Sequence, residues 1–204
     1  MAKIQNVDYL AMPNNAKQMR SCGQQLNTEV TNAYNSVNSM HSSWYGKRYN
    51  ELVTHFNNMI PQINEMLQLV VTDIPVSLEK VANNYSQADR GSNATTVENT
   101  TPKKITNITI HNDVGMKFIT ANVQEVQTKV SKNFKNAKDQ MNKISTEYNK
   151  VKWTSEASEA FKNKFNKLKT DITKSFDEIE KQFTNLMNQT KEDIQKAETA
   201  NTVQ

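Results

Sequence analysis

The side chains that could do covalent or metal chemistry are few and widely spaced in this sequence. The 204 residues include one cysteine, Cys22, and three histidines, which are His41, His55 and His111. Metal sites draw on histidines and cysteines at short fixed spacings, and a nucleophilic cysteine needs a base beside it. Neither pattern is present, and no glycine-rich phosphate loop occurs. We therefore predict no enzyme activity, no metal and no cofactor, and we expect the histidines at the surface or in turns.

Three short motifs could instead serve recognition of another protein. They are Trp44-Tyr45-Gly46, Tyr85-Ser86-Gln87-Ala88-Asp89 and Trp153-Thr154-Ser155. Residues four apart share one face of a helix, so Tyr85 and Asp89 would be presented together. Each motif also has a purely structural interpretation, in which the tryptophan ring fixes a turn and Tyr85 ends the core. The residues alone leave both interpretations open.

Apolar residues at steps of three or four predict the helices that position these motifs. Four such stripes run from Met19 to Trp44, from Tyr49 to Tyr85, from Val123 to Val151 and from Phe161 to Ala197. The near-heptad spacing is typical of packed helical bundles. With only 4 glycines and 4 prolines, the sequence lacks the frequent turn signals that a strand-rich fold needs. We also expect Cys22 to be a small buried side chain on the first stripe.

The prolines predict where the helices begin and bend. Pro13 suits the first turn of a helix, where its missing N–H is not needed. Pro61 and Pro75 lie inside the second stripe, and a proline in a helix interior costs about 3 kcal/mol. We therefore expect kinks or short breaks near 57–61 and 71–75. Since the stripe stays in phase across both prolines, we predict one bent helix.

Residues 90–113 differ in composition from the rest of the chain. They are polar and rich in threonine and asparagine, and their isoleucines have β-branched neighbours. This composition favours an extended linker over a helix. We therefore divide the chain into a first helical hairpin at 1–89, a linker at 90–113 and a second hairpin at 114–204.

The two halves repeat each other at an offset of 109 residues, which brings Trp44 onto Trp153. The same offset pairs large apolar residues without a gap: Leu52 with Phe161, Phe56 with Phe165, Met59 with Leu168, Ile63 with Ile172, Leu67 with Phe176, Val70 with Ile179 and Ile74 with Phe183. One hairpin cannot bury its apolar face alone, but two hairpins can close a four-helix bundle. We predict this all-α fold, and the long linker favours hairpins packed head to tail.

Charge and hydropathy exclude several classes of function. The net charge is only +4, and lysines interleave with glutamates as on a solvated helix surface, so we predict no nucleic-acid binding. No segment has the length of a stable membrane span, and the N-terminus lacks the apolar core of a signal peptide. Taken alone, these features indicate a cytoplasmic protein, unless export follows a route that needs no signal peptide.

The first half resembles the Trp-x-Gly family, helical hairpins of about 100 residues of the early-secreted-antigen type. Trp44 and Gly46 stand in the predicted turn, as the family's motif does. Tyr85 and Asp89 match the Tyr-x-x-x-Asp/Glu export signal that follows the second helix in the family. Because type VII secretion systems export this family, the resemblance implies that Tyr85 and Asp89 form an export signal.

The second half departs from the family pattern at both places. Ser155 replaces the glycine, and Ile194 and Glu198 stand where the signal would be. Serine adopts positive φ less readily than glycine, so we expect Thr154 or Ser155 to cap the last helix instead. The chain therefore resembles two such proteins fused into one tandem pseudo-dimer with a single signal.

The resemblance implies a non-enzymatic protein that is made in the cytoplasm of a bacterium and secreted without a signal peptide. It would be a substrate, or an export partner of larger secreted effectors, and a secretion-system ATPase would read its signal. Trp44 and Trp153 would each either fix a turn or join a composite groove with the other hairpin's signal end. Two alternatives stay open, a membrane-active helical toxin component and a cytoplasmic helical adaptor, as do further oligomerisation and a virulence-associated role.

Overall fold

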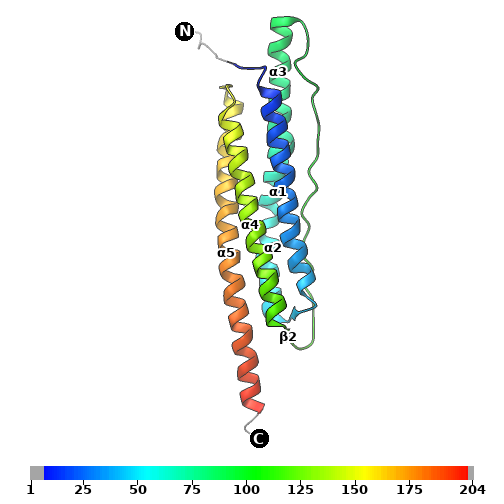
Figure 1. The fold of residues 1–204 in the computed structure, drawn as a ribbon, viewed down its shortest axis with the longest axis vertical. Helices are drawn as coiled ribbons and strands as arrows, with labels where there is room; N and C mark the ends of the chain where they lie inside the picture. Colours follow the sequence, from blue (N-terminus) through cyan, green and yellow to red (C-terminus); the bar gives the residue numbers. More distant parts are fainter. Residues whose placement is uncertain (1–6, 202–204) are drawn as a thin grey trace.

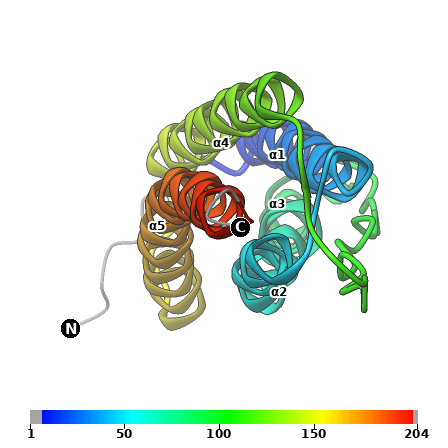
Figure 2. The same cartoon turned by 90° about the horizontal axis from the view of Figure 1, so that it is seen from below.

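A computed structural model describes residues 7–201 and confirms the all-α bundle. Helices α1 (Met12–Met40), α4 (Thr120–Asn149) and α5 (Glu156–Asn201) surround a common core with a fourth rod (Figure 1, Figure 2). That rod consists of α2 (Lys47–Gln68), the π-helix η1 (Leu69–Asp73) and α3 (Ile74–Arg90). Two short strands, β1 (Trp44–Tyr45) and β2 (Lys117–Phe118), pair beside the first turn.

The two hairpins pack head to tail, as the linker length predicts. The first turn lies at the lower end of the bundle in Figure 1 and the second turn, at 150–155, lies at the upper end. Helices α1 and α4 run antiparallel, because Asn15 Nδ2 donates to Glu147 Oε2 at 3.2 Å near one end and Asn122 Nδ2 donates to Ser43 Oγ at 3.0 Å near the other. Most of the packing joins one hairpin to the other, α1 along α4 and α2 along α5.

The core contains the predicted stripes almost completely. Of the seven apolar pairs at the 109-residue offset, all members are buried except Phe161, which is half-buried. The rings of Phe134 and Phe176 stack at 4.1 Å between centroids and join α4 to α5. Cys22 is half-buried rather than buried, because it lies at the edge of the α1–α4 seam, and the burial it has raises the pKa of its thiol. A thiol with a raised pKa is a poorer nucleophile at neutral pH, which agrees with a packing role.

The two prolines of the second stripe are accommodated differently. The break expected near 57–61 is absent, since α2 continues through Pro61 with Ile60 and Ile63 buried on either side. Burial of these neighbours outweighs the local cost of the proline. At the second site the chain forms the π-helix η1, and Pro75 falls in the first turn of α3. There the missing N–H of Pro75 would have served the carbonyl of Val71 four residues earlier.

Arg20 of α1 replaces this missing donor and anchors a buried ion pair. Its Nε donates to the Val71 carbonyl at 3.3 Å, and its Nη1 lies 2.9 Å from Glu79 Oε1 of α3. The side chains of Arg20 and Glu79 are only 6% and 4% exposed. Arg20 Nη2 also donates to the carbonyl of Glu98, whose N–H donates to Glu79 Oε2 at 2.9 Å. One arginine therefore joins α1, η1, α3 and the linker.

The linker runs beside α3 and α2 as an extended segment (Figure 1). Residues 91–116 contain no helix, and asparagine side chains of the rod make hydrogen bonds to the main chain of the linker. Each of the pairs Asn50–His111, Asn57–Ile108 and Asn64–Ile105 makes two hydrogen bonds, one from the amide Nδ2 to the linker carbonyl and one from the linker N–H to Oδ1. The buried side chains of Ile105 and Ile108 add apolar contacts. The division of the chain at 89 and 113 stays a prediction.

The spacing of this asparagine ladder follows from the geometry of helix and strand. Asn50, Asn57 and Asn64 lie seven residues apart, which is about 10.5 Å along a helix. Their linker partners lie three residues apart, which is about 10 Å along an extended chain. The next contact, Thr72 Oγ1 to the Thr100 carbonyl, comes eight residues after Asn64. Thr72 lies within η1, and its linker partner is five residues from Ile105 rather than three, so this contact lies outside the regular spacing of the ladder. Asn83 of α3 makes the same two hydrogen bonds to Thr95, outside this regular spacing.

We expect Asn57→Ala to lower the free energy of unfolding by about 1–3 kcal/mol. The substitution leaves the N–H and the carbonyl of Ile108 without their partners in a partly buried place. Asn58→Ala is the matched control, because Asn58 is an exposed neighbour on the same turn, and we expect it to change stability by less than about 0.5 kcal/mol. Urea unfolding measures both values, and equal losses would show that the ladder contributes nothing.

Candidate functional site

The first turn is built around the ring of Trp44, which is fully buried. Strand β1 pairs with β2 in antiparallel register, Trp44 opposite Phe118. The Trp44 ring lies against Phe118 of β2 at 5.5 Å, Phe183 of α5 at 5.9 Å and Tyr49 of α2 at 6.3 Å between centroids. One side chain of the first turn therefore contacts α2, β2 and α5. This geometry supports the structural interpretation of Trp44.

Gly46 has a backbone conformation that other residues rarely adopt. Its φ is 112°, and α2 begins at the next residue. A Cβ at this position would lie 3.3 Å from the carbonyl oxygen of Gly115, where the linker approaches the turn. The glycine of the Trp-x-Gly motif is therefore needed for two reasons: it adopts the positive φ without strain, and its lack of a side chain allows the linker to approach closely.

The second turn replaces the glycine with a helix cap. The Ser158 N–H donates to Ser155 Oγ at 3.1 Å, and the Ser155 N–H donates to Ser158 Oγ at 3.0 Å. This reciprocal pair satisfies free donors at the start of α5, as predicted for Ser155. Glu156 and Glu159 stand in the first turn, where they face the positive end of the helix dipole. The Trp153 ring is half-buried against the core, so it is less enclosed than Trp44.

Tyr85 and Asp89 lie in the last turns of α3, which continues past the start of α1 at the upper end of the bundle (Figure 1). Gly91 ends the helix in the left-handed conformation with φ 69°. Tyr85 is half-buried and Asp89 is exposed. Tyr9 of the N-terminal segment stacks on Tyr85 and donates a hydrogen bond to Asp89 Oδ2, and this bond lowers the pKa of the Asp89 carboxyl. The carboxylate is therefore charged at neutral pH.

These two motifs occupy opposite ends of the first hairpin, Trp44 below and Tyr85 with Asp89 above. The turn that shares an end with Tyr85 is the second one, which carries Trp153. Residues 5–90 match the family model described as proteins of 100 residues with WXG. The first hairpin belongs to this family. No curated protein and no solved structure matches the chain.

The WXG family is associated with substrates of type VII secretion systems and is not a family of enzymes. The match ends at residue 90, so the second hairpin carries the resemblance only through the repeat and its turn. In the matched hairpin the motif tryptophan, the motif glycine and Tyr85 all have defined contacts.

A pair of stacked histidines beside the WXG turn escaped the sequence analysis. The rings of His41 and His111 lie 3.7 Å apart between centroids, and His41 Nε2 lies 2.8 Å from Asp113 Oδ2. The histidines were expected at the surface or in turns, and that two of them meet was not foreseen, because it depends on the linker returning to the first turn and bringing His111 onto His41. Within residues 7–201 no group of three or more metal-binding side chains could hold an ion. The pair therefore fastens the linker to the turn.

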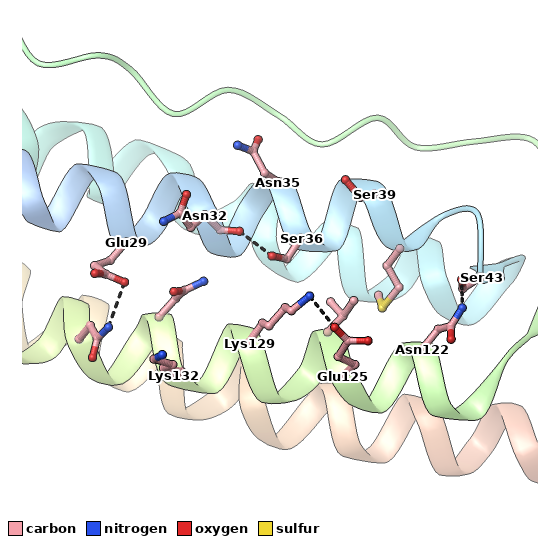
Figure 3. A pocket seen from close by; sticks show the side chains of 14 residues that line it. Glu29, Asn32, Asn35, Ser36, Ser39, Ser43, Asn122, Glu125, Lys129 and Lys132 are labelled. Atoms are coloured by element: carbon pink, nitrogen blue, oxygen red, sulfur yellow. Dashed lines mark hydrogen bonds and ion pairs between the residues drawn. The ribbon is translucent and has the colours of Figure 1, made fainter.

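A polar groove of about 810 Å³ follows the seam between α1 of the WXG hairpin and α4 (Figure 3). Hydrogen bonds cross it at both ends, Asn136 to Glu29 at 3.2 Å and Asn122 to Ser43 at 3.0 Å. Lys129, one of the two lysines that line the groove, pairs with Glu125 of the same helix at 2.7 Å. The two hydrogen bonds that cross the groove align the two hairpins. In the described part of the chain, no helix is both long and apolar enough to cross a membrane.

Proposed function

We propose that this protein is an exported substrate or export partner of a type VII secretion system and acts through protein–protein contacts. The observation that carries the proposal is the place of Tyr85 and Asp89. They stand in the family-matched hairpin, in the last turns of a helix that extends past its neighbours. A tyrosine ring and a carboxylate one turn apart form a compact recognition feature on one helix face.

The proposed reader of this feature is the secretion-system ATPase. A receptor with a basic side chain for Asp89 and a pocket for the Tyr85 ring would bind both groups at once. The half-buried Trp153 belongs to the turn at the same end of the bundle, and in this proposal it contributes to a composite recognition surface. In this proposal the second hairpin takes the place of the separate partner chain that would otherwise pack against the first hairpin. The protein is made in the cytoplasm, leaves without a signal peptide and accompanies larger effectors.

We expect Tyr85→Ala to reduce the secreted fraction of the protein by about tenfold or more. Removal of an aromatic anchor from an interface typically costs about 2 kcal/mol, which corresponds to about thirtyfold in affinity. The matched control is Asn84→Ala, an exposed neighbour on the same turn. Immunoblots of cells and culture medium, from a strain with intact type VII secretion, measure the fraction. A folded Tyr85→Ala protein that is secreted as well as the wild type would refute the proposal.

A further inference from the structure

We infer that the N-terminal segment at 7–11 is a removable cover over the export signal, with Tyr9 as the residue that closes it. The inference rests on the proposed function of Tyr85 and Asp89 and adds a regulation of that site. In the closed arrangement both recognition groups are engaged within the chain. A receptor therefore competes with Tyr9 for the signal.

The contacts of Tyr9 coincide with the two groups that the signal offers. The Tyr9 ring stacks on the Tyr85 ring, with 6.4 Å between centroids and an interplanar angle of 12°. The Tyr9 hydroxyl donates to Asp89 Oδ2. The single side chain of Tyr9 thus contacts both Asp89 and Tyr85 of α3, which lie 80 and 76 positions further along the sequence. Together with Val7 and Ala88 they surround a shallow hollow of about 410 Å³.

The start of α1 holds the C-terminal end of the segment. Met12 is fully buried, and Asp8 Oδ1 accepts a hydrogen bond from the Ala11 N–H at 3.3 Å just before the helix. The contact with the signal itself lies at the surface, and Asp89 is exposed. Hydrogen bonds between groups that water can reach contribute little to stability, because water replaces them. The cover can therefore open without unfolding of α1.

A cover of this kind lowers the apparent affinity of the receptor by the fraction of molecules in which the signal is open. If about one molecule in ten is open, removal of the cover raises the apparent affinity about tenfold. Tyr9→Phe keeps the ring and removes the hydroxyl that engages Asp89, so it opens the cover in part. Tyr9→Ala removes both contacts. The sign of the effect is informative, because a Tyr9 that itself touched the receptor would lower affinity when removed.

The test compares the full-length wild type with Tyr9→Ala, Tyr9→Phe, Tyr85→Ala and the control Leu10→Ala, whose side chain is 54% exposed in the same segment. The probe is the soluble ATPase part of the type VII system of the strain that encodes the protein. Affinity is measured by titration calorimetry, the secreted fraction by immunoblot, and folding by circular dichroism. We expect affinity and secretion to rise about five- to tenfold for Tyr9→Ala and about twofold for Tyr9→Phe, with no change for Leu10→Ala.

The outcomes separate this inference from the proposed function. Loss of binding and secretion in Tyr85→Ala, with gains in both Tyr9 variants, supports both. Loss in Tyr85→Ala with unchanged or weaker binding of folded Tyr9→Ala and Tyr9→Phe overturns the cover and leaves the signal in place. Normal binding and secretion of Tyr85→Ala, or no secretion of the wild type, overturns the signal and the cover with it.

Discussion

Replacement of Trp44 by alanine is expected to lower the free energy of unfolding by about 3–5 kcal/mol. The ring is 0% exposed and contacts Phe118 and Phe183, so its removal leaves a cavity between the first turn, β2 and α5. Urea unfolding followed by circular dichroism measures the change. The effect is large because the surroundings of a buried tryptophan collapse only in part.

The second tryptophan is a matched control within the same chain. Trp153 occupies the corresponding position of the repeat but is only half-buried, so Trp153→Ala is expected to cost about 1–2 kcal/mol. Equal losses for the two variants would contradict the different burial of the two turns. A loss below about 1 kcal/mol for Trp44→Ala would contradict its place at the junction of the two hairpins.

Arg20→Met is expected to cost about 3–5 kcal/mol, the second large effect. It removes the positive partner of Glu79 and leaves a carboxylate whose side chain is only 4% exposed. It also removes the donor that Arg20 provides to the Val71 carbonyl in place of Pro75. An unpaired charge in the interior is far more costly than the pair is stabilising. Chemical denaturation of the wild type and the variant measures the difference.

The double variant Arg20→Met with Glu79→Met separates the unpaired charge from the loss of packing. With both charges replaced by apolar side chains of similar length, we expect most of the lost stability to return. A loss of about 1 kcal/mol in the free energy of unfolding should remain, because the Val71 carbonyl still lacks its donor. A double variant that is as unstable as Arg20→Met alone would contradict the assignment of the cost to the unpaired Glu79 carboxylate.

The helices and the turns could be predicted from the sequence because apolar periodicity is a local property. The stripes in the residues from Met19 to Ile194 correspond to buried or half-buried faces, and Ser155, one of the two residues predicted to cap the last helix, is the cap. The head-to-tail packing followed from the reach of the linker. The turn motif at Trp44 and Gly46 could be found for the same reason, since its residues are adjacent in sequence. The export signal at Tyr85 and Asp89 stays a prediction.

The contacts that escaped prediction join residues distant in sequence. The rungs of the asparagine ladder span 41, 51 and 61 residues, and the contact of Tyr9 with Asp89 spans 80. No local pattern indicates which asparagine meets which part of the linker until the path of the linker is known. The break wrongly expected near Pro61 has a related cause. Local propensity counts the cost of the proline but not the burial of Ile60 and Ile63 beside it.

The central claim is that each hairpin is stable only against the other, since the packing of α1 on α4 and of α2 on α5 exceeds the packing within each hairpin. Thermal unfolding of the separate fragments 1–113 and 114–204, monitored by circular dichroism, tests it most directly. We predict that neither fragment unfolds cooperatively alone and that an equimolar mixture regains one cooperative transition. A fragment 1–113 that unfolds cooperatively by itself, at the temperature of the full chain, would contradict the account.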